Sequence, residues 1–189
     1  MSAVVIGEDQ LARCPWAATH PVNAQYHDAE WGRPIVGESA YFERLTLEAF
    51  QSGLSWLTIL NKRDNFRAAF SGFDAQAVAA YDDSDRARLL ADAGIVRNRL
   101  KIDAAITNAR ATIALRDAGG LQGFLEGFRP VRGPAPKVSG EIPTISAESI
   151  AMSKALKKQG FAFVGPTTMY ALMQAVGLVN DHLADCHAR

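Results

Sequence analysis

The sequence predicts an all-α fold, on three observations. Seven stretches place apolar residues three or four positions apart, the spacing that gives a helix one apolar face. They are residues 39–53, 55–72, 74–81, 84–94, 96–120, 147–160 and 166–177. Residue types that begin and end helices stand at their ends, and no alternating strand pattern of useful length competes with them.

The expected helix ends follow the same order along the chain. Ser39, Asp74 and Ser84 stand at the starts of the first, third and fourth stretches, where a short polar side chain can accept hydrogen bonds from first-turn amides. Glycine readily takes the left-handed conformation that ends many helices. It closes five of the stretches: Gly53, Gly94, Gly119, Gly160 and Gly177.

We expect a single domain over residues 1–189, because this length suffices to bury a core without a cofactor. Four of the eight prolines fall in one Pro/Gly-rich connection at about residues 129–145. Proline and glycine interrupt helices, so this connection should separate a long N-terminal part from the C-terminal helices.

Composition restricts partners and compartment. The chain has 20 basic and 20 acidic residues and no net charge, so a nucleic-acid partner has to be met by a local patch. The N-terminus lacks the pattern of a signal peptide, and no stretch approaches the roughly 20 apolar residues of a membrane span. We therefore expect a cytoplasmic protein whose two cysteines bind metal or fill core and form no disulfide.

The segment "NDHLADC" near the C-terminus contains half of a possible metal site. If it is helical, His182 and Cys186 lie four positions apart on one face, within reach of a single ion. A closed zinc site needs four protein ligands. The only other thiol, Cys14, is the natural third ligand, and a site closed by protein ligands is structural. The alternative is that both cysteines are ordinary small core residues.

The fourth ligand should be a histidine, and three are available. On a helix, His187 would point about 100° away from its neighbour Cys186, which disfavours it. His20 and His27 remain, and their spacing does not choose between them.

The residues around these candidates resemble a known family. The matching segments are "RCPW" (13–16), "YHDAEWG" (26–32), "LEAFQSGLSWLTIL" (47–60), "AGIVRNRLKI" (93–102), "MSKALKKQGFAFVG" (152–165) and "QAVGLVNDHLADC" (174–186). In this order and at these spacings they resemble DNA-3-methyladenine glycosylase I, a family of the helix-hairpin-helix superfamily. The resemblance covers nearly the whole chain.

The resemblance implies one structural zinc ion per chain. Carried over position by position, its ligands are Cys14, His27, His182 and Cys186, and His20 is left out. An ion held by these residues would join the N-terminal and C-terminal segments of the helical domain.

The resemblance also implies an activity. The family excises 3-methyladenine from alkylated double-stranded DNA by hydrolysing the bond between base and deoxyribose, after flipping the nucleotide out of the duplex. This releases the free base and leaves an abasic site. The family is monofunctional, so no lyase lysine is expected, and we expect a monomer.

Glu48 is the candidate catalytic and base-binding carboxylate. On a helix it shares a face with Tyr41, Leu45 and Ser52, a mostly apolar setting in which an unpaired carboxylate is costly. A carboxylate there could accept hydrogen bonds from an adenine edge and favour nearby positive charge. The alternative is an exposed glutamate on a helix surface.

Trp56 and Tyr26 match the family's aromatic pocket residues. Aromatic rings can stack on a flipped base and attract its cationic form. Tyr26 adjoins the proposed ligand His27, so the metal would fix one pocket wall. The alternative for both is ordinary core packing.

The segment "AGIVRNR" resembles the hairpin of a helix-hairpin-helix element. In such a hairpin, which includes Gly94, backbone amides and a helix N-terminus hold a phosphate without reading sequence. Arg97, Arg99 and Lys101 would add positive charge there. The alternative is a corner between two helices with a solvated basic face.

The turn "SGLS" at residues 52–55 carries Leu54 between Glu48 and Trp56. By analogy with the family, Leu54 would enter the gap left by the flipped nucleotide, as an apolar wedge does in other DNA-binding proteins.

The chain departs from the family at Asn23, where better-known members carry a further pocket tyrosine. One aromatic wall is therefore missing or supplied from elsewhere. Asp103 and Asp117 lie beyond the hairpin but are expected to be surface residues.

Two alternatives stay open: a non-catalytic protein that binds alkylated DNA on the same scaffold, and an unrelated small zinc protein whose helices form a partner surface.

Overall fold

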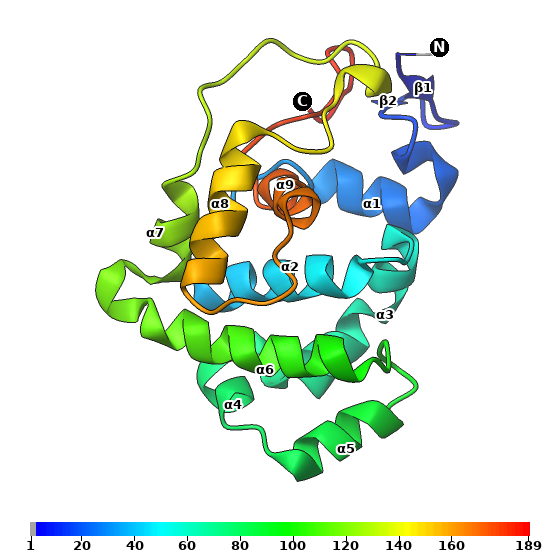
Figure 1. Ribbon diagram of the computed structural model, residues 1–189. Coiled ribbons are helices and arrows are strands. Elements are labelled where there is room, and N and C mark those ends of the chain that lie inside the picture. Colours follow the sequence, from blue (N-terminus) through cyan, green and yellow to red (C-terminus); the bar gives the residue numbers. More distant parts are fainter. Residues whose placement is uncertain (1–2) are drawn as a thin grey trace.

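The computed structural model describes residues 3–189, and this part of the chain is mostly helical (Figure 1). The helices are α1 (Pro21–Ala29), α2 (Glu38–Gln51), α3 (Trp56–Ala69), α4 (Ala75–Ala79), α5 (Asp83–Ala91), α6 (Arg99–Ala114), α7 (Gly120–Glu126), α8 (Ala147–Lys158) and α9 (Pro166–Ala175). Two strands, β1 (Val5–Ile6) and β2 (Ala12–Arg13), pair antiparallel near the N-terminus. The predicted all-α class is confirmed.

All seven predicted helices are present, but two further helices have weak sequence signals. Helix α1 begins with Pro21 at a position where the missing amide costs nothing, and His20 caps it by accepting from the Val22 amide at 3.1 Å. Helix α7 contains Gly120 and Gly123, which lower its intrinsic helix propensity. Neither shows a long apolar period.

Two of the three predicted N-caps are wrong. Asp74 caps α4 as expected, accepting from the amides of the first turn. Ser39 and Ser84 instead lie inside their helices. The N-cap of α5 is Asp82, whose Oδ1 accepts from the amides of Ser84 and Asp85 and which forms a capping box with Asp85.

Helix α2 lies at the centre of the molecule, between α6 and α9 in Figure 1. Nine of its fourteen residues are buried. Five phenylalanines from α2, α3 and the following turn pack ring against ring: Phe42, Phe50, Phe66, Phe70 and Phe73. This core fixes the position of α2, and therefore also the positions of the side chains that α2 directs toward α1 and α9.

The terminal segment 180–186 is not helical, so the helical spacing considered for His182 and Cys186 in "NDHLADC" does not occur. The side chain of Asn180 accepts from the His182 amide at 3.2 Å and so competes with a helical hydrogen-bond pattern. The Ala184 amide donates to the carbonyl of Pro136 at 2.8 Å, which ties the segment to the proline-rich connection.

Close backbone contact places this segment beside α1. The turn after α9 crosses the turn after α1 at Gly177, where a Cβ atom would lie 2.5 Å from the Arg33 carbonyl carbon and 2.6 Å from the Pro34 nitrogen. Gly177 has φ of 70°, which also favours glycine. The Gly32 amide donates to the Gln174 carbonyl at 3.0 Å. The C-terminal residues are thereby brought next to the N-terminal ones.

Among residues 3–189, every helix is too short or too polar to cross a lipid bilayer.

Candidate base-binding pocket and metal centre

A cavity of about 500 Å³ opens between α1, α2, α3 and α9, and it is also lined by Ser139, Ile142, Pro143 and Thr144. Its size is in the range of small-molecule sites. All three tryptophans of the chain line it. Its aromatic and charged lining comprises Trp16, Tyr26, Trp31, Glu48, Trp56 and Tyr170. The predicted pocket residues Glu48, Tyr26 and Trp56 are therefore brought together.

Glu48 is 5% exposed and has neither a hydrogen-bond nor an ion-pair partner among residues 3–189. Burial raises the pKa of Glu48 to about 8, and the charge of Arg44 one turn earlier on α2 opposes this rise. An unpaired buried carboxyl at a cavity wall is the kind of group that marks a functional site. The surface-residue interpretation of Glu48 is excluded by its burial.

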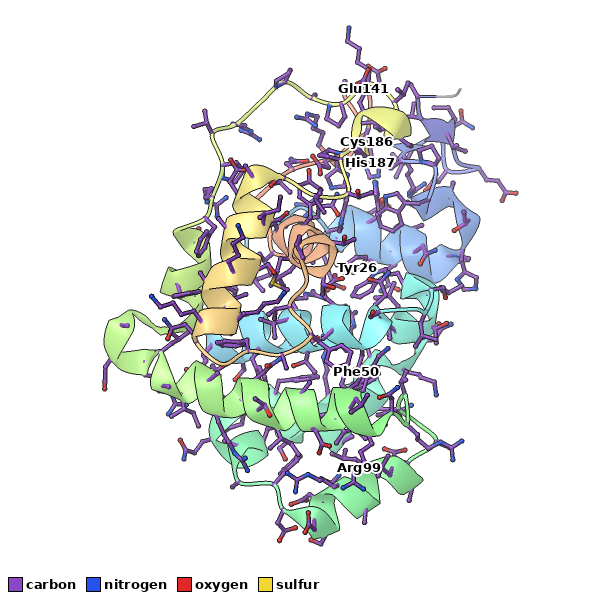
Figure 2. All side chains as sticks on the ribbon, viewed as in Figure 1. Tyr26, Phe50, Arg99, Glu141, Cys186 and His187 are labelled. Carbon is purple, nitrogen blue, oxygen red and sulfur yellow. The ribbon has the colours of Figure 1, made fainter. Side chains whose placement is uncertain are left out.

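Tyr26 and Trp56 form a corner of the cavity, with ring centroids 5.3 Å apart and an interplanar angle of 53°. Figure 2 shows Tyr26 between α1 and α2. The Tyr26 hydroxyl and the Trp56 indole Nε1 are both buried, and neither has a hydrogen-bond partner within residues 3–189. Because buried polar groups in folded proteins are nearly always paired, these two atoms point to a ligand with polar edges.

Arg44 lies behind this corner, and the sequence reasoning missed it. Its guanidinium stands 5.4 Å from the centre of the Tyr26 ring and pairs with Glu30. Glu30 also accepts from Arg63 at 2.8 and 3.0 Å. The network fixes the Tyr26 ring. Arg44 could have been recognised in the sequence from its spacing to Glu48, because the two residues lie one turn apart on α2.

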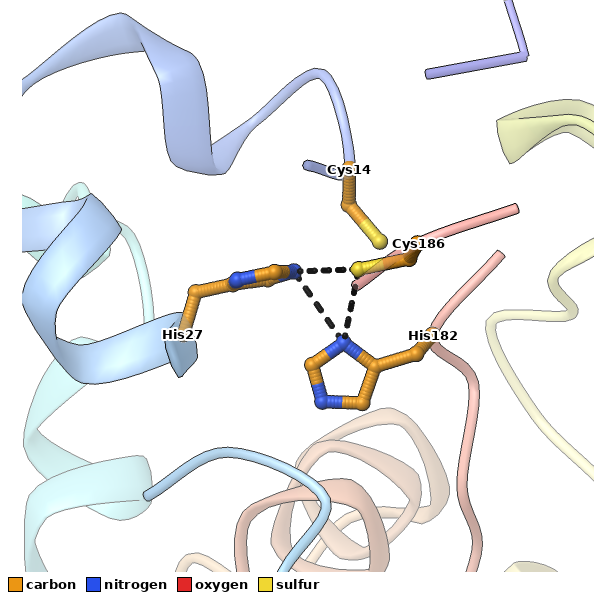
Figure 3. A group of neighbouring side chains, drawn as sticks. All are labelled: Cys14, His27, His182 and Cys186. Carbon is orange, nitrogen blue, oxygen red and sulfur yellow. Dashed lines mark hydrogen bonds between the residues drawn. The ribbon is translucent and has the colours of Figure 1, made fainter. Parts of the chain in front are cut away.

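The four predicted metal ligands converge (Figure 3). The nitrogen and sulfur atoms that Cys14, His27, His182 and Cys186 can offer a metal all lie within 4.8 Å of one another, and all four residues are buried. Nε2 of His27 lies 3.0 Å from Nδ1 of His182, and the Cys186 sulfur lies 3.4 and 3.5 Å from these two nitrogens.

The surroundings of this cluster suit a metal. The other ring nitrogen of each histidine has a hydrogen-bond partner outside the cluster. Nδ1 of His27 lies 2.8 Å from the Asp28 carboxylate, and Nε2 of His182 lies 2.9 Å from the Trp31 carbonyl. Such outer contacts orient metal-binding imidazoles. Burial lowers the pKa of His182 to about 4 and lowers that of His27. Both rings are thus in the neutral form that binds metals.

The remaining histidines are not members of this group of four, although His187 forms a second possible ligand group with His27 and Asp28. His20 is used as the N-cap of α1. Nε2 of His187 lies 2.9 Å from the Asp28 carboxylate. The helical argument against His187 was wrong, because its segment is not a helix, but the residue still lies outside the group of four.

The residues expected to contact DNA differ in how exposed they are. Leu54, on the turn between α2 and α3, is 40% exposed, and Arg97 and Arg99 are exposed. In Figure 2, Arg99 lies at the opposite end of the molecule from Cys186. The amide of Gly94 donates to the Asp92 carboxylate at 2.7 Å, so this amide already has an acceptor within its own turn.

Lys101 corrects the prediction that it adds charge to the DNA-binding hairpin. It is 8% exposed, and its ammonium donates to the carbonyls of Phe50 at 2.8 Å and Ser52 at 2.6 Å. These carbonyls belong to the end of α2, where unpaired carbonyls attract a cation. Lys101 therefore holds the turn that carries Leu54.

We expect Lys101→Met to change the stability of the protein and Arg97→Ala to change the salt dependence of DNA binding. Lys101→Met should lower the free energy of unfolding by about 1–3 kcal/mol, because two carbonyls lose a charged donor, and should leave the salt dependence of DNA binding unchanged. Arg97→Ala should leave stability within about 0.5 kcal/mol and reduce the salt slope by about one. Denaturant unfolding and DNA titrations at several salt concentrations measure both. A reduced salt slope in Lys101→Met would contradict this assignment.

Asn23 does not line the cavity. It is buried, and its amide donates to the Thr19 hydroxyl at 3.0 Å. The aromatic walls beyond Tyr26 and Trp56 come from Trp16, Trp31 and Tyr170, none of which was predicted as a pocket residue from the sequence. As expected, Asp103 and Asp117 are not pocket residues. Asp103 pairs with Arg86 and Arg99, and Asp117 is exposed.

Comparisons with known proteins agree on one family. The model of the methyladenine glycosylase family matches residues 16–189. DNA-3-methyladenine glycosylase 1 of Escherichia coli (strain K12) is 46% identical over 181 residues, covering 93% of this chain and 96% of that protein.

Solved structures show the same fold. A crystal structure of 3-methyladenine DNA glycosylase I is 44% identical with a TM-score of 0.90, covering 94% of this chain and 99% of that one. A variant of 3-methyladenine DNA glycosylase I in complex with 3-methyladenine is 33% identical with a TM-score of 0.88, covering 93% and 96% of the two chains. The chain therefore belongs to the methyladenine glycosylase family.

Proposed function

We propose that this chain is a DNA glycosylase that hydrolyses the N-glycosidic bond of 3-methyladenine in alkylated DNA. The free base is released and an abasic site remains. The observation that carries this proposal is the unpaired, buried carboxyl of Glu48 in a cavity walled by aromatic rings. The names of the relatives support a catalytic function over a protein that only binds alkylated DNA.

The chemistry suits the lesion. A methyl group on N3 makes the purine of the nucleotide cationic, so the base is already a good leaving group and needs little acid catalysis. The aromatic rings of Tyr26 and Trp56 can stack on the flipped base and attract its charge. Glu48, whose burial disfavours its ionised form, regains that form beside a cation and stabilises the positive charge that develops as the bond lengthens.

The DNA is proposed to lie across the turn that carries Leu54 and across the hairpin with Arg97 and Arg99. Leu54 fills the gap left by the flipped nucleotide, and the two arginines meet phosphates of double-stranded DNA. The exposure of all three side chains supports this arrangement. The protein acts as a monomer.

We further propose that Cys14, His27, His182 and Cys186 hold one structural zinc ion. The donor set supports this, since two thiolates would balance the charge of the dication and two neutral imidazoles would supply the remaining two ligands. With four protein ligands the site has no open position for water. When bound, the ion joins the two termini of the domain mechanically.

The assay for the proposed function is base release. Duplex DNA treated with a methylating agent should yield free 3-methyladenine, separated by chromatography, and the strands should stay intact until alkali cleaves the abasic sites. Intact strands are expected because the reaction is hydrolytic and leaves the sugar-phosphate backbone uncut. A protein that retains the methylated duplex without releasing base above a blank would instead be the non-catalytic alternative.

A further inference from the structure

The carboxylate of Asp181 connects the terminal segment to the wall of the base pocket. One of its oxygens, Oδ2, accepts from the Tyr170 hydroxyl at 2.7 Å and from Nε2 of Gln174 at 2.8 Å. Both donors are on α9, one helical turn apart, and both line the cavity that contains Glu48. The next residue, His182, belongs to the cluster of candidate metal ligands.

The two hydrogen bonds fix what α9 presents to the cavity. A carboxylate only accepts hydrogen bonds, so the Gln174 amide has a single compatible orientation, with Nε2 toward Asp181 and Oε1 as its other polar atom. Tyr170 is 5% exposed, and its hydroxyl would lose its acceptor in a part-buried setting if Asp181 were absent. Burial, followed by the bond to Asp181, raises the pKa of Tyr170, so the phenol remains a donor.

We propose that Asp181 is a positioning residue for base recognition: it holds Tyr170 and Gln174 in the arrangement that forms the α9 wall of the pocket. This inference rests on the proposed function, because it takes 3-methyladenine as the ligand. Asp181 does not touch the base. It acts through two side chains whose acceptor is shared, so removing that acceptor disturbs both at once.

The test measures affinity for the free base 3-methyladenine. Because all three tryptophans line the cavity, intrinsic fluorescence reports its occupation. Asp181→Ala should raise the Kd for 3-methyladenine roughly tenfold or more, since two charge-assisted hydrogen bonds are lost. Asp181→Asn keeps an acceptor oxygen and should restore the affinity to within about threefold of wild type. A merely structural role for residue 181 would not produce this rescue.

A double-mutant cycle makes the test specific. Tyr170→Phe should raise the Kd in the wild-type background and have no further effect in the Asp181→Ala background, because the bond that it removes is already gone. The matched control is Asp185→Ala. Asp185 is an exposed aspartate of the same terminal segment, without a hydrogen bond or ion pair within residues 3–189, and its removal should leave the Kd unchanged.

Three outcomes would overturn the proposal. They are wild-type affinity in Asp181→Ala, additive effects of Tyr170→Phe and Asp181→Ala, and equal loss in Asp181→Asn and Asp181→Ala. Zinc content is measured alongside. If Asp181→Ala loses metal, the decision passes to Tyr170→Phe and Gln174→Met, which leave the terminal segment untouched, and wild-type affinity in both would refute the role of Asp181. Failure of the wild-type protein to bind 3-methyladenine would count against the proposed function instead.

Discussion

Glu48→Gln is expected to slow the release of 3-methyladenine by about 10²–10³-fold, the usual effect of removing one group that stabilises charge in a transition state. Glutamine has nearly the same shape and keeps an acceptor oxygen, so the flipped base can still enter the pocket. It lacks the negative charge that stabilises the positive charge developing as the glycosidic bond lengthens. Single-turnover release from methylated duplex DNA measures the effect, and excision at the wild-type rate would refute the assignment of Glu48.

The same substitution should stabilise the protein at high pH. The pKa of Glu48 is about 8 in the folded protein against an ordinary value of 4.5, so the folded state binds the extra proton between these values. The free energy of unfolding therefore falls as the pH rises from about 4.5 to 8, by an amount on the order of a few kcal/mol. Glutamine has no such penalty.

Denaturant unfolding at pH 5 and at pH 9 should accordingly show a gap between Glu48→Gln and wild type that widens at the higher pH. A gap that does not change with pH would show that Glu48 is less strongly perturbed than its burial indicates. Loss of activity with a gain of stability is typical of residues kept for function.

Helices with many apolar residues at helical spacing were predicted correctly from the sequence. Segments whose structure depends on contacts with residues far away in the sequence were not. Helix α2 shows its period plainly, whereas the start of α1 depends on Pro21 and the His20 cap. A helix was considered for the segment "NDHLADC", yet His182 and Cys186 meet the other candidate ligands without one, because the crossing at Gly177 places the segment beside α1.

The site residues show the same division. Glu48 was assigned from the resemblance to the family, and its position on a mostly apolar helix face agreed with that assignment. Lys101 was misassigned, since its charge is visible in the sequence but the carbonyls of Phe50 and Ser52 that it meets are about fifty residues earlier. Tyr170 and Gln174 were missed for the same reason, because each is paired with Asp181 in the terminal segment. Residue type suggests chemistry, but only packing decides whether a charge faces DNA or a helix end.

Cys186→Ser is expected to lower the free energy of unfolding on the order of 3 kcal/mol or more. The cluster joins residues 14 and 27 to residues 182 and 186, so a bound ion closes a loop of nearly the whole chain, and metal-binding energy becomes folding energy. Serine is a poor replacement for a thiolate on zinc. Elemental analysis should find about one zinc per chain in wild type and little in the variant, and thermal unfolding with and without a chelator should differ only for wild type.

The matched control for this prediction is His20→Asn. It changes a histidine near the cluster in sequence, while asparagine can still cap α1, so zinc content and stability should stay near those of wild type. Because the reactive carboxyl is on α2, inside the main core, the folded fraction of Cys186→Ser should retain most of the excision rate at low temperature, and the rate should fall with the loss of folded protein on warming. If Cys186→Ser were as stable as wild type, the cluster would not be a stabilising structural metal site. The same would follow if folded Cys186→Ser lost excision as completely as Glu48→Gln.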